Sequence, residues 1–162
     1  MIANKRVSGL LIFTSLALAF MLIVMPLPRW LANFWPQWYV ITVLFWVLMQ
    51  PLRFGICMAW CCGLIIDVLY GTPLSQHGLA LATAAYLVIK LREPLWVFPH
   101  WQQTLLLLPV VLIYEFILFW IDGIIGYDMS PLRRWLPGVT GVLLWPAWAW
   151  GLERIAEIDV RS

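Results

Sequence analysis

Apolar residues form long runs along the chain, and short polar or proline-containing segments separate these runs. Most runs approach the roughly 20 residues that an α-helix needs to cross the hydrocarbon core of a bilayer. Runs 34–50 and 78–91 are short for a full crossing, so either both are tilted helices with their flanks included or one of them is a re-entrant segment. We predict an all-α membrane protein, a compact bundle of about six transmembrane helices in a single domain (1–162) without a separate soluble domain. The predicted helices are 7–27, 34–50, 54–70, 78–91, 104–121 and 136–152.

Composition supports this class. Hydrophobic residues make up 64% of the chain and charged residues 11%, with a mean hydropathy of +0.90. A soluble domain is about 45–50% apolar and about 25% charged. The loops are too short for a soluble catalytic domain, which excludes a nucleotide-binding fold or a periplasmic hydrolase. Run 7–27 follows Lys5 and Arg6 as in a signal peptide, but it is too long and has no cleavage site, so we predict an uncleaved anchor.

The basic residues predict the orientation of the bundle. If the N-terminus is cytoplasmic, the inner segments hold seven basic residues and the outer segments hold three. This asymmetry satisfies the positive-inside rule, so both termini are predicted to be cytoplasmic. The inner residues are Lys5, Arg6, Arg53, Lys90, Arg92, Arg154 and Arg161, and the outer ones are Arg29, Arg133 and Arg134.

Motifs for chemistry are not found in the sequence. There is no block of five or six basic residues that would favour nucleic acid, no phosphate-binding loop and no Ser-His-Asp set. Cys57, Cys61 and Cys62 lie in one apolar run at a spacing unlike that of zinc ligands, so we predict that they are packing residues. His77 and His100 fall in loops on opposite sides of the membrane. We therefore expect no catalytic residue, cofactor or metal.

Two acidic residues, Asp67 and Glu115, lie inside apolar runs. A charged acid at the centre of a membrane helix costs about 3 kcal/mol, so each should face the bundle, find a partner or be protonated. Both fall in the outer half, where they could share a cavity with Asp122 and with Arg133 or Arg134 as counter-ion. Two interpretations stay open: the carboxyls only tie helices together, or they have a binding or coupling role.

Small residues recur at every fourth position of the third run and form a seam on one helix face. Small residues at this interval let two helices approach closely. The seam either packs against the fourth run, where Gly78, Ala82 and Ala85 offer a matching face, or forms a docking groove for a helix of a partner. The seam residues are Gly55, Ala59, Gly63, Asp67 and Gly71.

Two prolines lie inside predicted helices, Pro109 in the fifth and Pro146 in the sixth. Each lacks a backbone donor and should kink its helix. The polar segment 153–159 is predicted to be a solvated helical extension.

The chain resembles the rod shape-determining MreD family over nearly its whole length. The resemblance is strongest in Gly-x-x-x-Asp-x-x-x-Gly, at Gly63, Asp67 and Gly71. One difference is Ser75, where the family often has another glycine. Further matching segments are 36–38, 85–87, 101–103 and 141–146.

The resemblance implies a non-enzymatic inner-membrane component of the cell-wall elongation complex, which links the actin-like cytoskeleton to peptidoglycan synthesis and maintains rod shape. The implied partners are the bitopic protein MreC, the filament protein MreB indirectly, a SEDS-type polymerase and a class B penicillin-binding transpeptidase. It also implies a bundle similar to the substrate-binding subunits of energy-coupling-factor transporters. The alternative is a small-molecule binding or transport subunit that uses Asp67, Glu115 and Asp122 as an acidic cavity.

Overall fold

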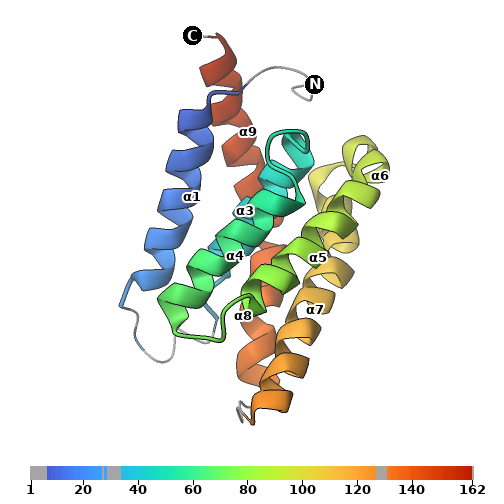
Figure 1. Cartoon of the computed structure of the whole chain (residues 1–162). Helices are drawn as coiled ribbons and strands as arrows, with labels where there is room; N and C mark the ends of the chain where they lie inside the picture. Colours follow the sequence, from blue (N-terminus) through green and yellow to red (C-terminus); the bar gives the residue numbers. More distant parts are fainter. Residues whose placement is uncertain (1–6, 27, 29–33, 127–130, 162) are drawn as a thin grey trace.

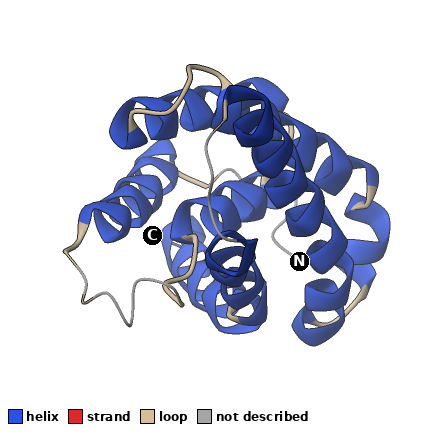
Figure 2. Cartoon of the chain, turned by 90° about the horizontal axis from the view of Figure 1, so that it is seen from below, coloured by secondary structure: helices blue, strands red, loops and turns tan. Residues whose placement is uncertain are grey.

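The computed structural model describes residues 7–26, 28, 34–126 and 131–161, and within these residues it contains helices and no strand. Figure 1 shows a bundle of long helices with both chain ends on the same side, and Figure 2 shows the same bundle end-on. The all-helical class is confirmed. The helices are α1 (Gly9–Val24), α3 (Trp38–Met49), α4 (Ile56–Tyr70), α5 (Gln76–Lys90), α6 (Arg92–Val97), α7 (His100–Ile125), α8 (Pro131–Leu143) and α9 (Trp145–Arg161).

Helix α3 is the centre of the bundle. Every residue from Tyr39 to Met49 is buried, and the helix packs against α1, α4, α5, α8 and α9. Its largest side chain, Trp46, is fully buried and donates its indole N–H to Ser15 Oγ of α1 at 2.8 Å. A helix that is apolar on all sides is stable only when other apolar surfaces enclose it.

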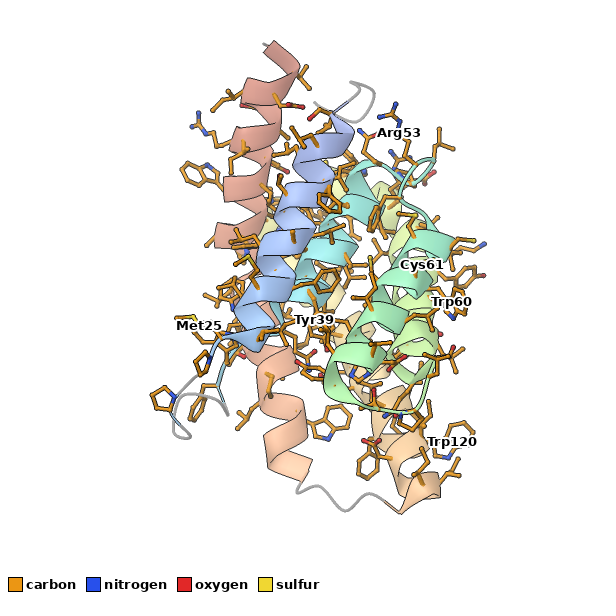
Figure 3. All side chains as sticks on the ribbon, turned by 60° about the vertical axis from the view of Figure 1, so that its left-hand side comes forward. Met25, Tyr39, Arg53, Trp60, Cys61 and Trp120 are labelled. Carbon is orange, nitrogen blue, oxygen red and sulfur yellow. The ribbon has the colours of Figure 1, made fainter. Side chains whose placement is uncertain are left out.

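The outer helices expose large apolar side chains. Trp60 of α4 and Trp120 of α7 lie at the periphery of the bundle, as Figure 3 shows, and Trp120 is 64% exposed. Exposed apolar surface on this scale is rare in soluble monomers and marks contact with lipid or protein. Helix α7 is long and apolar enough to cross a membrane, whereas α1, α3 and α4 are apolar but shorter. Further exposed residues include Phe13, Met21, Val68, Leu105, Phe116 and Ile158.

Helix α7 is longer than the predicted 104–121. It begins after Pro99 and ends at Gly126, whose φ of +82° closes the helix in the left-handed conformation that glycine tolerates. Pro109 lies inside α7, and the helix continues through it. Since neighbouring helices pack along α7, the lost backbone hydrogen bond does not end the helix.

The single helix predicted for 136–152 is instead two helices, α8 and α9, which meet at Leu144. Pro146 has no N–H to offer the carbonyl of Val142, and its ring crowds that carbonyl, which explains the break. Helix α9 then continues through the polar segment 153–159. The short helix α6 was not predicted. Its fully buried Leu95 holds it against the bundle.

The turn between α4 and α5 contains Ser75 at φ +77°, the one non-glycine residue with positive φ in the described chain. A left-handed conformation costs an L-residue about 1–2 kcal/mol. Ser75 Oγ accepts a hydrogen bond from Trp60 Nε1 at 3.1 Å, an exposed contact that compensates little of this cost.

We expect Ser75→Gly to stabilise the protein by about 1 kcal/mol because glycine adopts this conformation without strain. Thermal unfolding of the purified chain in detergent measures the effect. The matched control is Ser75→Ala, which keeps the strain, loses the hydrogen bond and should unfold at a lower temperature than the wild type. Equal midpoints for the two variants would contradict the assignment of strain to this residue.

Candidate functional site: a layer of buried acids

Three acidic side chains are buried in the half of the bundle that lies away from the chain ends. Asp67 is 1% exposed, Glu115 1% and Asp122 7%. Asp67 lies in the last turn of α4, and the two others lie in the second half of α7. Because α4 and α7 both run away from the termini, as Figure 1 shows, their carboxyl ends carry these acids to the same half.

Asp67 accepts hydrogen bonds from residues that follow it closely in the chain. Its Oδ1 accepts hydrogen bonds from Thr72 Oγ1 at 2.9 Å and from the His77 backbone N–H at 3.0 Å. The same oxygen lies 2.7 Å from His77 Nδ1. The turn makes this possible, because Gly71 ends α4 at φ +65° and the chain returns so that His77 enters the first turn of α5. His77 was predicted in a loop, but it lies in the first turn of α5 and binds Asp67.

Glu115 is paired with α3 and covered by α8. Its Oε1 accepts a hydrogen bond from Gln37 Nε2 at 2.7 Å. Gly138 of α8 lies so close that a Cβ built on it would be 2.8 Å from Glu115 Oε1. A side chain at 138 would therefore require the Glu115 carboxyl to shift, and sequence reasoning missed this close contact.

Asp122 is paired with α5. Its Oδ1 accepts a hydrogen bond from Gln76 Nε2 at 2.6 Å, and Gln76 itself is 3% exposed. Each of the three acids thus has a donor from a different residue: His77, Gln37 or Gln76. We call these six side chains, together with Thr72, the acid layer.

Aromatic residues connect the parts of the acid layer. The His77 ring lies 5.6 Å from the Tyr70 ring and 6.5 Å from the rings of Tyr39 and Tyr114, measured between centroids. The hydroxyls of Tyr39 and Tyr114 are 2.9 Å apart. Tyr114 directly precedes Glu115, so contacts run from the Asp67–His77 pair across α3 to α7.

Three acceptor atoms of the acid layer have no donor among the described residues. In the part of the chain that the structure describes, Asp67 Oδ2, Gln37 Oε1 and Gln76 Oε1 are buried and receive no hydrogen bond. The side chains of Arg133 and Arg134, predicted as counter-ions, lie outside the described residues. A shared cavity of Asp67, Glu115 and Asp122 therefore stays a prediction.

Two of the seam residues, Gly63 and Asp67, contact the first turn of α5. A Cβ on Gly63 would be 2.3 Å from Gly78 Cα, so the two backbones are in direct contact there. Ala59 is completely buried. Gly55 and Gly71 lie just outside α4, at its N-terminal and C-terminal ends.

At the opposite end of the bundle, a second set of polar side chains joins the helices by hydrogen bonds. Sequence reasoning did not identify this set. Gln103 accepts a hydrogen bond from Trp145 Nε1 at 2.9 Å and donates to the Leu95 carbonyl at 2.8 Å, which joins α6, α7 and α9. The segment 101–103 was noted only as part of the family resemblance. Asp159 of α9 accepts from Ser8 N and Oγ at the start of α1.

His100 lies at this same end, where its Nε2 is 3.3 Å from Glu153 of α9. Burial raises the pKa of Glu153, and His100 counteracts part of the rise.

Cys62 is buried, whereas Cys57 and Cys61 are exposed. No three His, Cys, Asp or Glu side chains among the described residues converge as a metal site requires.

Comparison with known proteins assigns the chain to a family. The family model for rod shape-determining protein MreD matches residues 3–152. A rod shape-determining protein MreD from Haemophilus influenzae is 29% identical over 150 residues, which cover 93% of this chain and 92% of that protein. No solved structure matches the chain. Since the family match spans the seam and the acid layer alike, the chain belongs to the MreD family of rod shape-determining proteins.

Proposed function

We propose that the chain is a multi-pass inner-membrane component of the machinery that elongates the wall of rod-shaped bacteria. It acts by holding partners together rather than by catalysis. Its membership of the MreD family over residues 3–152 is the observation that carries this proposal.

Three features support placement in the membrane with both termini in the cytoplasm. The outer helices expose apolar side chains while the acids face inward, which is the arrangement that a hydrocarbon solvent requires. Helix α7 can span a membrane. Both chain ends lie on one side of the bundle, as expected for an even number of crossings.

The proposed direct partner is MreC, with MreB reached indirectly and the SEDS-type polymerase and class B transpeptidase bound in the same complex. The packing of α4 on α5 leaves an exposed apolar face on α4, which includes Ile65, Val68 and Leu69. This face and the outer loops are the surfaces that we assign to MreC. The cytoplasmic segments around Arg53, 90–93 and the C-terminal helix face the cytoskeletal side.

A copurification experiment tests the proposal. An affinity-tagged chain, solubilised from membranes in mild detergent, should bring MreC with it in a stoichiometric ratio, and depletion of the chain should turn rods into spheres. A variant with Val68→Glu on the exposed face of α4 should lose MreC, whereas Leu105→Glu on the exposed face of α7 should retain it. Purification of the chain alone, with cell shape unchanged on depletion, would exclude this function.

The acid layer supports a second candidate, a small-molecule binding or transport subunit. Unsatisfied buried acceptors such as Gln76 Oε1 are the groups that a ligand with several donors would use. The similarity to substrate-binding subunits of energy-coupling-factor transporters stays a prediction. A metabolite bound to the chain in native mass spectra, together with uptake that Asp67→Asn abolishes, would favour this candidate over the first.

A further inference from the structure

Two buried hydrogen-bond donors without an acceptor lie close together on the short helix α6. Arg92 Nε and Trp96 Nε1 are both enclosed by protein atoms, and neither donates a hydrogen bond within the described part of the chain. The two residues are one helical turn apart, so their side chains share a face of α6. The guanidinium carbon of Arg92 lies 5.7 Å from the centroid of the Trp96 ring. A buried donor that makes no hydrogen bond is unfavourable, and two of them together indicate a site for an acceptor.

The charge of Arg92 selects the kind of acceptor. Its guanidinium forms no ion pair with a described carboxylate and lies over the ring of Trp96 instead. The neighbouring acid, Glu93, is exposed and, as the next residue of the helix, lies on a different face. Arginine stays charged at physiological pH and binds phosphate oxygens through several N–H groups. A phosphate group offers several acceptor oxygens, so it matches the donors of Arg92 and Trp96 together.

The position of α6 favours a lipid as the source of the phosphate. The helix lies in the half of the bundle that holds both chain ends, as Figure 1 shows, and α7, which can span a membrane, begins at His100 just after it. Val97, Phe98 and Trp101 expose apolar side chains at this point. A phospholipid joins a phosphate to acyl chains, and basic and aromatic residues are favoured where headgroups meet hydrocarbon. A free phosphate would make no use of the exposed apolar residues.

We propose that Arg92 and Trp96 form a binding site for the phosphate of an anionic phospholipid, with the exposed apolar residues beside α6 in contact with an acyl chain. An anionic headgroup such as phosphatidylglycerol compensates the charge of Arg92, whereas the ammonium group of phosphatidylethanolamine repels it. The bound lipid holds the connection between α5 and α7 at the membrane surface. This inference rests on the proposed placement in the membrane and does not depend on any protein partner.

Native mass spectrometry of the full chain, titrated with lipid in detergent, measures the dissociation constant of the first bound lipid. The wild type should bind phosphatidylglycerol more tightly than phosphatidylethanolamine with the same acyl chains. Arg92→Gln should weaken the binding of phosphatidylglycerol about tenfold, as expected for the loss of a charge-assisted hydrogen bond, and should remove the preference. Trp96→Phe keeps an aromatic ring but removes the N–H, so it should weaken binding by a smaller factor.

Arg154→Gln is the matched control. The guanidinium carbon of Arg154 lies 5.3 Å from the ring centroid of Trp150 in α9, so the two residues form the same kind of pair in the same half of the bundle. Trp150 is exposed, and neither side chain of this described pair holds a buried donor without a partner. The variant should therefore bind phosphatidylglycerol as the wild type does.

Equal affinities of the wild type for the two lipids, or wild-type affinity in Arg92→Gln, would overturn the proposal. So would displacement of phosphatidylglycerol by millimolar inorganic phosphate, which would assign the donors to a free anion rather than to a lipid. Membrane fractionation tests the placement in the membrane separately. A chain that inserts but shows no lipid preference refutes the lipid site alone, whereas a chain recovered in the soluble fraction refutes the placement itself.

Discussion

Replacement of Asp67 by leucine should abolish copurification with MreC while the chain still inserts into the membrane. The substitution removes the oxygen that Thr72 Oγ1, the His77 backbone N–H and the His77 ring all contact, so the buried His77 N–H loses the acceptor that the structure gives it. Each buried donor left unsatisfied costs about 1–3 kcal/mol, so the α4–α5 turn should open. Insertion itself should become easier by about 3 kcal/mol because the intramembrane acid is gone.

Membrane fractionation and copurification, measured on the same cells, separate the two effects. The matched control is Asp67→Asn, which retains an oxygen at the position of Oδ1 and should keep most of the complex. If Asp67→Leu assembled with MreC as the wild type does, the role of Asp67 would be reduced to helix packing.

Gly63→Leu should destabilise the fold by more than about 3 kcal/mol, the upper part of the range for overpacked sites. A Cβ on residue 63 would lie 2.3 Å from Gly78 Cα and 2.4 Å from its nitrogen. Both are backbone atoms, so no side-chain rotation can relieve the clash and α4 must move away from α5. Loss of monodisperse protein in size-exclusion chromatography, with a lower unfolding temperature, is the expected result.

Gly123→Ala is the matched control for this substitution. Gly123 lies in α7, and a Cβ there meets no atom within 4 Å. Alanine in a helix interior is favoured over glycine by about 1 kcal/mol, so this variant should be as stable as the wild type or slightly more so. If Gly63→Leu matched Gly123→Ala in stability, direct contact between the α4 and α5 backbones would be excluded.

Hydrophobic patterning predicted the long elements well. A run of apolar residues is a local property of the chain, so it can be found without knowledge of the fold. The ends of α1, α3, α4 and α5 lie within a few residues of the predicted 7–27, 34–50, 54–70 and 78–91. Breaks and ends were less predictable. Pro109 and Pro146 have the same covalent structure, yet α7 continues through the first and the chain breaks before the second.

Asp67 and Glu115 were identified by their cost in an apolar run, and Asp122 as a possible neighbour in the same cavity, but the partners of these acids were not identified. A carboxyl inside a membrane helix must find a donor, and this follows from desolvation alone. Which donor it finds depends on how the helices are arranged. Gln37 and Gln76 looked like ordinary loop or helix-end residues, and Gly138 carried no sequence signal of its closeness to Glu115.

The sequence by itself determined that this chain is helical, that it is suited to lipid and that it must shelter its intramembrane acids, because these properties depend on the apolar area and charge of each segment. Only the tertiary structure decided that Asp67 binds His77, because that contact needs the left-handed conformations of Gly71 and Ser75 to turn α5 back onto α4. It also decided that Oδ2 stays unsatisfied, since the number of donors around a buried atom depends on all the helices packed about it.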